Sequence, residues 1–147
     1  MRVSVIIPTR NEAEVIGDAL SRIPQDIVDE VIVVDSSTDD TPKIAESAGA
    51  IVVNEPRLGY GWALETGVKK ARGEVVAYID GDNTYDFGDL RQIVEPILRG
   101  ECDIVLGSRL KGNMHDGSMP PINKFGNIAI TLLFNLLFTQ KVSDTQC

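Results

Sequence analysis

Short apolar runs alternate with amphipathic segments along most of this chain. The runs are rich in β-branched residues, and we expect strands over residues 3–8, 30–35, 50–54, 75–80 and 103–107. The segments between them carry apolar residues at helical spacing, and we expect helices over residues 13–22, 41–48, 61–71 and 87–99. This alternation predicts an α/β fold, with a mainly parallel sheet and helices on both of its faces.

Polar and mostly acidic residues follow the predicted strands. The segments that follow the first, second, fourth and fifth strands are Pro8-Thr9-Arg10-Asn11-Glu12, Asp35-Ser36-Ser37-Thr38-Asp39-Asp40-Thr41, Asp80-Gly81-Asp82-Asn83-Thr84-Tyr85-Asp86 and Gly107-Ser108-Arg109. Because the carboxyl ends of parallel strands share one edge of a sheet, we expect these side chains to gather there, where such sheets bind ligands.

Asp80 and Asp82 are the candidate metal ligands. They flank Gly81 directly after a buried strand, and the glycine lets the backbone approach a ligand closely. Hard carboxylate oxygens suit Mg²⁺ or Mn²⁺, which bind through one or two carboxylates together with substrate phosphates. The alternative is a polar turn before the next helix, with Asp86 as its N-cap.

Three other features are candidates for contact with a nucleotide. Asp35 ends the second strand, where an acidic residue often meets a base or ribose edge. Gly61 belongs to a glycine-containing helix start, residues 58–63, whose backbone amides can face phosphate. Arg57 and Arg109 can each hold a phosphate through two hydrogen bonds, and the alternative for each is a surface salt bridge.

The charge balance narrows the class of ligand. The 147 residues include 14 Lys and Arg against 22 Asp and Glu, a net charge of -8, which argues against nucleic-acid binding. A phosphorylated ligand would therefore need an added positive charge, such as a bound divalent cation. The two cysteines lack the spacing of a metal site, and we expect them to be reduced thiols. The sequence contains no recognisable secretion signal or membrane-spanning run, so we expect a cytoplasmic protein.

Residues 123–138 form an apolar helix with two interpretations. It is either a buried core or interdomain helix, or an interfacial element near a lipid-linked acceptor, with peripheral contact at the cytoplasmic membrane face. A second copy of the chain could also cover it, which leaves a homo-oligomer open.

Five motifs, taken in order, resemble inverting family-two glycosyltransferases with the GT-A fold. They are Val-Ile-Ile-Pro-Thr-Arg-Asn-Glu (5–12), Val-Ile-Val-Val-Asp-Ser-Ser-Thr-Asp-Asp-Thr (31–41), Gly-Tyr-Gly-Trp-Ala-Leu-Glu-Thr-Gly (59–67), Asp-Gly-Asp-Asn-Thr-Tyr-Asp (80–86) and Val-Leu-Gly-Ser-Arg (105–109). The closest resemblance is to polyprenyl-phosphate (dolichyl-phosphate) mannosyl- and glucosyltransferases. Their segment before a Gly-Phe/Leu-Arg continuation is similar to residues 142–147, so we interpret the chain as a C-terminally truncated GT-A domain.

The resemblance implies a role for individual residues. Pro8, Thr9, Asn11 and Glu12 would line the nucleotide pocket, and Asp35 would contact the base. Asp80 and Asp82 would face the ribose, the diphosphate and the metal, with Asp82 as the direct ligand. Arg109 would meet a phosphate of donor or acceptor, and Asp144 would belong to a later acidic segment that returns to the catalytic site. Residues 1–110 would then bind the nucleotide-sugar, and residues 111–147 would begin the acceptor-binding part.

The expected reaction is transfer of a hexose from a donor of the GDP-mannose or UDP-glucose type to polyprenyl or dolichyl phosphate. Two alternatives remain open for the acceptor and the activity. In the first alternative, the acceptor is a saccharide or another hydroxyl compound, whose reaction would need a general base. In the second, the chain is a nucleotide-sugar-binding module with a degenerate transferase fold. A sugar-phosphate nucleotidyltransferase is disfavoured, because the Gly-rich signature of those enzymes does not follow the first strand.

Overall fold

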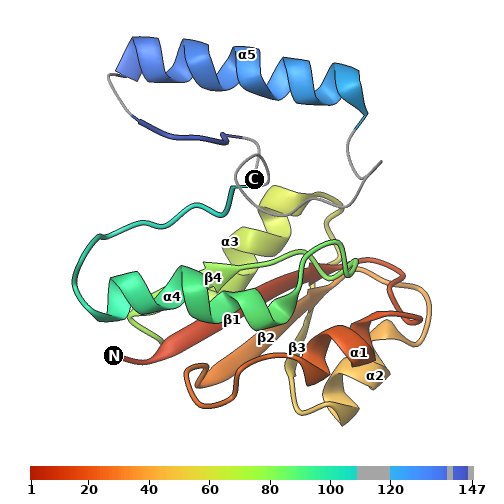
Figure 1. Ribbon diagram of the computed structural model, residues 1–147. Helices are drawn as coiled ribbons and strands as arrows, with labels where there is room; N and C mark the ends of the chain where they lie inside the picture. The colour runs from red at the N-terminus through yellow and green to blue at the C-terminus, as the bar shows by residue number, and fades with distance from the viewer. Residues whose placement is uncertain (109–119, 139–140, 146–147) are drawn as a thin grey trace. The chain divides into compact units, whose positions relative to one another are not determined.

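The computed structural model describes residues 1–108, 120–138 and 141–145, and the chain divides into two units, Met1–Asp103 and Ile104–Cys147 (Figure 1). The first unit contains a four-stranded sheet with the order β3-β2-β1-β4. Its strands are β1 (Val3–Thr9), β2 (Glu30–Asp35), β3 (Ile51–Asn54) and β4 (Val75–Tyr78). All three pairings are parallel, which confirms the predicted α/β architecture.

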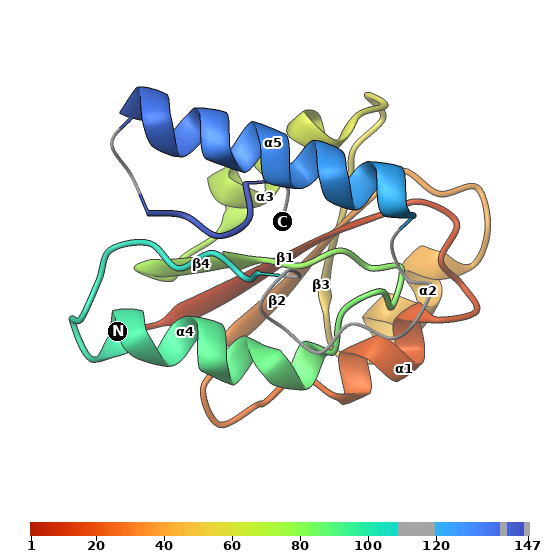
Figure 2. The ribbon, with the colours of Figure 1, turned by 45° about the horizontal axis from the view of Figure 1, so that its top comes forward.

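Strand β1 lies at the centre of the sheet, between β2 and β4 (Figure 2). Its residues Val5, Ile6 and Ile7 are completely buried, because helices cover both faces of the sheet. A strand buried on both faces has no polar side to alternate with its apolar side. This is why β1 is an almost continuous apolar run in the sequence.

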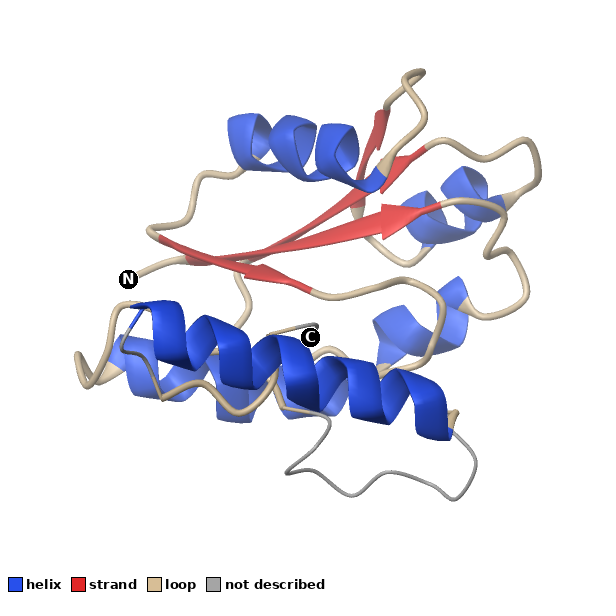
Figure 3. Ribbon diagram, turned by 90° about the horizontal axis from the view of Figure 1, so that it is seen from above, coloured by secondary structure: helices blue, strands red, loops and turns tan. Residues whose placement is uncertain are grey.

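Helices pack on the two faces of the sheet (Figure 3). Their bounds are α1 (Ile16–Ser21), α2 (Thr41–Ser47), α3 (Tyr60–Lys70) and α4 (Leu90–Leu98), with a 3-10 turn, η1 (Phe87–Asp89), before α4. One core cluster joins buried residues of α1, α2, η1 and α4 to one face of the sheet. On the other face, Ala63 of α3 packs with Ile6, Ile32 and Val34.

The sequence predictions differ from the structure at a fifth strand and at the bounds of several elements, such as β4, which ends at Tyr78 rather than at residue 80. Residues 103–107 were expected to form a fifth strand, but they have no strand structure. Apolar side chains alone do not make a strand without a neighbouring strand to pair with, and Ile104 and Leu106 are 77% and 53% exposed. The first helix begins at Ile16 rather than at residue 13, because residues 13–15 form a turn.

The second unit contains α5 (Pro121–Phe138), which buries polar rather than apolar side chains. Asn127 and Thr131 are buried, whereas Leu132 and Leu136 are 64% and 80% exposed. Successive turns of one helix face carry Asn127, Thr131 and Asn135. Together they bind residues 142–145 through hydrogen bonds of side chains and backbone. No helix in the described ranges is both long enough and apolar enough to cross a membrane.

Gly67 controls how closely α3 approaches the sheet. A Cβ atom at this position would lie 2.4 Å from Cγ2 of Ile6, which is completely buried and has no free space to move into. We expect Gly67→Ala to lower the free energy of unfolding by about 1–3 kcal/mol, the usual cost of overpacking a core. Urea denaturation measures this change.

Gly61 provides a control on the same helix, because a Cβ atom there would meet open space. We expect Gly61→Ala to leave stability unchanged or to raise it by up to about 1 kcal/mol. Equal stability of the two variants would contradict the close packing of α3 on β1.

Candidate functional site

A cavity of about 380 Å³ opens in the first unit at the carboxyl ends of β1 and β4. Loops that follow β1, β2 and β4 form its walls, together with the segment that leads into α3. The lining residues are Pro8, Thr9, Arg10, Glu12, Ser36, Leu58, Gly59, Tyr60, Ala63, Asp80, Gly81 and Asp82. The structure therefore brings together six of the residues that the sequence assigns to nucleotide-sugar binding, namely Pro8, Thr9, Glu12, Asp80, Gly81 and Asp82.

Gly81 allows the segment after β4 to lie directly on the end of β1. A Cβ atom at Gly81 would be 2.7 Å from Cγ2 of Thr9 and 3.2 Å from the carbonyl oxygen of Pro8. Any larger residue would push this segment away from β1. The glycine thus keeps Asp80 and Asp82 at the cavity wall that Pro8 and Thr9 form.

Three carboxylates, those of Glu12, Asp80 and Asp82, line the cavity. Burial raises the pKa of Glu12, and the negative charges of Asp82 and Asp39 raise it further. These neighbouring negative charges disfavour the ionised form of Glu12, and an added cation would favour it. The cavity therefore favours a positively charged ligand or an anionic ligand that brings its own cation.

Tyr60 lies beside this acidic wall. Burial raises the pKa of its hydroxyl to about 12, and the charge of Asp80 and a hydrogen bond to Asp80 contribute to the increase. The hydroxyl is therefore protonated at neutral pH and acts as a hydrogen-bond donor to Asp80. In the segment that follows β4, the carboxylate of Asp82 accepts a hydrogen bond of 2.9 Å from the backbone amide of Thr84.

Asp80 and Asp82 fit a divalent cation that arrives with a phosphorylated ligand. Within the described ranges, no cluster of three or more His, Cys, Asp or Glu side chains is arranged to hold a metal ion. Mg²⁺ does not require such a cage, because it commonly binds one or two carboxylates together with substrate phosphates and water. Two carboxylates on one cavity wall meet that requirement.

Arg10 brings a positive charge to the cavity. Its guanidinium forms no ion pair with any residue that the structure describes, so it remains available to an anionic ligand. The sequence analysis assigned this role to Arg57 and Arg109 and missed Arg10. Its position directly after β1 was the signal that could have identified it.

Asp35 and Asn11 do not line the cavity but connect the loops around it. Asp35 is buried, and its carboxylate accepts hydrogen bonds from the hydroxyl of Thr9 at 2.8 Å and from the amide of Ser37 at 3.0 Å. Asn11 has a left-handed backbone with φ of 59°, and its side-chain oxygen accepts a hydrogen bond from the amide of Thr38. These bonds tie the loop after β1 to the loop after β2.

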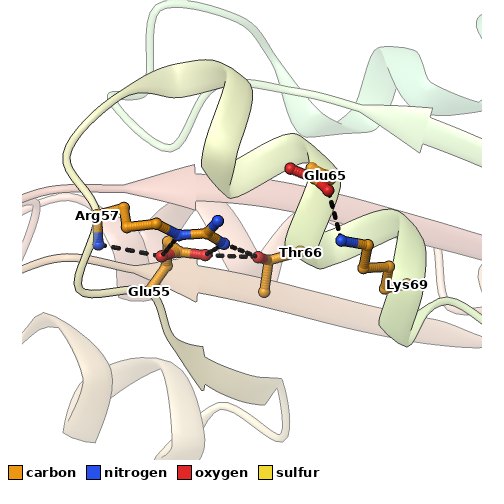
Figure 4. Close-up of polar contacts among 5 residues, drawn as sticks. All are labelled: Glu55, Arg57, Glu65, Thr66 and Lys69. Atoms are coloured by element: carbon orange, nitrogen blue, oxygen red, sulfur yellow. Dashed lines mark hydrogen bonds and ion pairs between the residues drawn. The ribbon is translucent and has the colours of Figure 1, made fainter.

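Arg57 and Gly61 also lie outside the cavity lining. The guanidinium of Arg57 makes two hydrogen bonds of 2.7 Å to the carboxylate of Glu55 (Figure 4). The salt bridge that the sequence analysis gave as the alternative for Arg57 is therefore present, but its partner is buried rather than at the surface.

The two remaining candidates lie in the second unit. Arg109 falls outside the described residues. Asp144 is buried, and its carboxylate accepts a hydrogen bond of 2.7 Å from the side-chain amide of Asn127. Thr131 in turn donates a hydrogen bond to the side-chain oxygen of Asn127, which holds that amide in place.

Sequence reasoning did not assign five further lining residues, Ser36, Leu58, Gly59, Tyr60 and Ala63. Four of them belong to the glycine-containing start of α3, for which only Gly61 was selected. Helical geometry explains the difference, since residues one or two positions apart on a helix face different directions.

A family model described as glycosyl transferase family 2 matches residues 4–146. Among curated relatives, the low-salt glycan biosynthesis hexosyltransferase Agl6 of Haloferax volcanii is 38% identical over 97% of this chain and 36% of its own length. The dolichyl-phosphate hexose transferase of the same organism is 37% identical over 97% of this chain and 62% of its own length. The chain therefore spans between about one third and two thirds of the length of these relatives.

Solved structures of similar proteins cover about two thirds of this chain. A crystal structure of glucosyl-3-phosphoglycerate synthase from Mycobacterium tuberculosis, in complex with Mn²⁺, UDP and phosphoglyceric acid, has a TM-score of 0.61 and 34% identity. The match covers 68% of this chain and 40% of that protein. Mannosyl-3-phosphoglycerate synthase from Rubrobacter xylanophilus also has a TM-score of 0.61, with 31% identity over 67% of this chain and 36% of that protein.

The pairing of Glu55 with Arg57 predicts a pH-dependent contribution to stability. Hydrogen bonds from Arg57 and Thr66 lower the pKa of Glu55 from 4.5 to about 2. Because the pKa is lower in the folded state, the stabilisation is complete above pH 4.5 and is lost as the pH falls toward 2. We expect Glu55→Gln to lower the urea midpoint at pH 7, and we expect the difference from wild type to shrink between pH 4.5 and pH 2.

Glu65→Gln is the control for this experiment, because Glu65 pairs with Lys69 at an exposed position of α3. Exposed pairs contribute little to stability, so its midpoint should differ less from wild type at pH 7. A difference between wild type and Glu55→Gln that does not change with pH would contradict the ionic character of the Glu55–Arg57 pair.

Proposed function

The chain belongs to glycosyl transferase family 2, and we propose that it transfers a hexose from a nucleotide-diphospho-sugar to an acceptor, with inversion and with a divalent cation. The observation that carries this proposal is the cavity that Asp80 and Asp82 line together with Arg10 and with the end of β1. The names of the Haloferax hexosyltransferase relatives, and the Mn²⁺ and UDP bound to the mycobacterial synthase, support the reaction class.

Each charged residue of the cavity has a role in this proposal. Asp80 and Asp82 would hold Mg²⁺ or Mn²⁺ together with the donor diphosphate, with Asp82 as the direct ligand. When bound, the cation neutralises the charge that develops on the departing nucleoside diphosphate. Arg10 donates charge-assisted hydrogen bonds to the same diphosphate. Pro8, Thr9 and Glu12 form the wall against which the nucleotide binds.

The proposed acceptor is a polyprenyl or dolichyl phosphate. An oxygen of its phosphate attacks the anomeric carbon from the face opposite the diphosphate, the bond from that carbon to the diphosphate oxygen breaks, and the nucleoside diphosphate leaves. Because a phosphate acceptor is already anionic, this reaction needs no general base. The name of the dolichyl-phosphate hexose transferase from Haloferax supports this acceptor class.

A second candidate is a small phosphorylated acceptor that reacts through a hydroxyl group. The observation in its favour is the phosphoglyceric acid bound to the mycobacterial synthase, a structural neighbour at 34% identity. A hydroxyl acceptor requires a general base within hydrogen-bond reach. In either case we assign Asp144 to the acceptor side of the reaction and Arg109 to a phosphate of the donor or the acceptor.

Calorimetric titration of the chain with UDP, GDP, UDP-glucose and GDP-mannose, with and without Mn²⁺, tests the donor site. We expect one nucleotide to bind in the presence of Mn²⁺ only, and we expect Asp82→Ala to weaken its binding by at least about 100-fold, the upper range for disturbed metal sites. Asp89→Ala, which removes an exposed carboxylate outside the cavity lining, should bind as wild type does.

The same titration tests Arg10. Arg10→Gln should weaken nucleotide binding about tenfold while Mn²⁺ dependence remains, as for the loss of one charge-assisted hydrogen bond. Arg72→Gln makes the same change of charge at an exposed residue outside the lining and should have no effect. If the folded wild-type chain binds none of the four nucleotides, the donor-site assignment is wrong.

Asp144→Asn tests the assignment of Asp144 to catalysis. The substituted side chain keeps an oxygen that can accept the hydrogen bond from Asn127, so the second unit should still fold. If Asp144 is a general base, we expect turnover to fall at least about 100-fold while nucleotide affinity is unchanged. Transfer of labelled hexose to polyprenyl phosphate and to phosphoglyceric acid measures the effect and identifies the acceptor class.

Undiminished turnover by Asp144→Asn with both acceptors would remove Asp144 from the catalytic residues. If the wild-type chain binds the nucleotide but transfers sugar to neither acceptor, the nucleotide-sugar-binding module becomes the better description of this chain.

A further inference from the structure

We propose that Arg57 is a positioning residue of the donor cavity, held between Glu55 and Trp62 so that it fixes the intervening wall formed by Leu58, Gly59 and Tyr60. This inference rests on the proposed function, because it treats the cavity as the nucleotide site. Arg57 does not line the cavity itself, and it acts through the residues that follow it.

Glu55 is the fixed end of this arrangement. It follows β3, is only 2% exposed, and its backbone amide donates a hydrogen bond of 2.9 Å to the carbonyl oxygen of Asp35 in β2. Its carboxylate accepts hydrogen bonds from the backbone amide of Arg57 at 3.0 Å and from the hydroxyl of Thr66 at 2.5 Å. A buried carboxylate with these partners is a rigid anchor attached to the edge of the sheet.

Arg57 connects this anchor to the first turn of α3. Its Nε and Nη2 atoms each lie 2.7 Å from the Glu55 carboxylate, the two-pronged geometry that lysine cannot reproduce. Its guanidinium carbon also lies 4.1 Å from the centre of the Trp62 ring, a cation–π contact. The side chain of Arg57 therefore joins Glu55, after the end of β3, to Trp62 in the first turn of α3.

Apart from the hydrogen bond of Tyr60 to Asp80 and those that the amides of Trp62 and Ala63 donate to the carbonyl oxygen of Gly59, the wall between these two contacts is exposed. Leu58 and Tyr60 are 62% and 55% exposed, so no packed core fixes them. Gly59 has a φ of 135°, a conformation that favours glycine. Because glycine has no Cβ atom, it also has more conformational freedom in the unfolded state than other residues. Only four residues separate Arg57 from Trp62, so fixing both ends fixes the wall as well.

A second ion pair on the same helix provides a matched comparison. Glu65 and Lys69 also pair on α3, but both side chains are exposed and neither contacts the cavity (Figure 4). Removing this pair changes the charge of α3 without releasing the wall. In addition, Trp62 is the single tryptophan of the sequence, so its fluorescence reports on the Arg57 contact without interference from other indoles.

The experiment compares wild type, Arg57→Lys, Thr66→Val and Lys69→Met. Binding of UDP and of GDP in the presence of Mn²⁺ is measured by calorimetry, and Trp62 emission is recorded with and without the nucleotide that wild type binds. All measurements are made at a temperature at which circular dichroism shows every variant to be folded. Arg57→Lys keeps the positive charge but loses the two-pronged pairing, whereas Thr66→Val removes one hydrogen bond to Glu55 with little change of shape.

We expect Arg57→Lys to raise the Kd for the nucleotide that wild type binds, UDP or GDP, about tenfold, within the range that misplaced binding groups cost. We also expect the Trp62 emission of the free protein to shift to longer wavelength, because the indole loses the guanidinium that covers it. Thr66→Val should change both quantities in the same direction and by less. Lys69→Met should match wild type in both.

Two results would overturn the inference, and they can be told apart. If wild type binds UDP or GDP, and both Arg57→Lys and Thr66→Val bind the same nucleotide with the affinity of Lys69→Met, Arg57 does not position the cavity wall, although the proposed function stands. If wild type binds no nucleotide with Mn²⁺, the proposed function fails, and the inference fails with it.

Discussion

The hydrogen bonds that pair β1 with β2 on one side and with β4 on the other determine where the cavity forms. Since the three strands are parallel, the loops that follow them leave the sheet at the same edge. The register places Thr9 opposite Asp35. The hydrogen bond between their side chains holds together the starts of the loops that follow β1 and β2. Gly81 then allows the loop after β4 to contact β1 without a side chain in between. The burial of β1 and the convergence of the cavity residues are thus two consequences of one pairing pattern.

The charges around the cavity fall into two groups with different chemistry. Glu12, Asp80 and Asp82 lie on its walls, and the pKa of Glu12 is raised by burial and further by the negative charges of Asp82 and Asp39. Glu55, by contrast, is neutralised within the protein by Arg57, and its lowered pKa reports that attraction. The carboxylates of the first group can bind a cation. The ion pair of Glu55 and Arg57 instead fixes the backbone after β3. A chain with a net charge of -8 can therefore present a site suited to a phosphorylated ligand.

The second unit reverses the usual polarity of a helix that packs against another segment. Asn127, Thr131 and Asn135 of α5 face residues 141–145, and their amide and hydroxyl groups satisfy the polar groups of that segment. Directional hydrogen bonds thus specify the position of the buried Asp144 more narrowly than apolar packing would. The leucines of α5 remain exposed as a result.

The sequence by itself determined the α/β class, the family and the strands at which the site forms, because the apolar periodicity and the motifs are local properties of the chain. The match to glycosyl transferase family 2 over residues 4–146 confirms the family.

Only the tertiary structure decided which polar residues face the cavity. Arg57 and Arg10 are both arginines near a strand end, but Arg57 is paired with a buried glutamate 2 residues earlier, whereas Arg10 lines the cavity. Likewise, apolar residues at 103–107 could not show that a strand partner is missing, and the composition of α5 could not show that its polar stripe is the buried one. Each of these outcomes depends on contacts between segments distant in sequence, which a local pattern does not record.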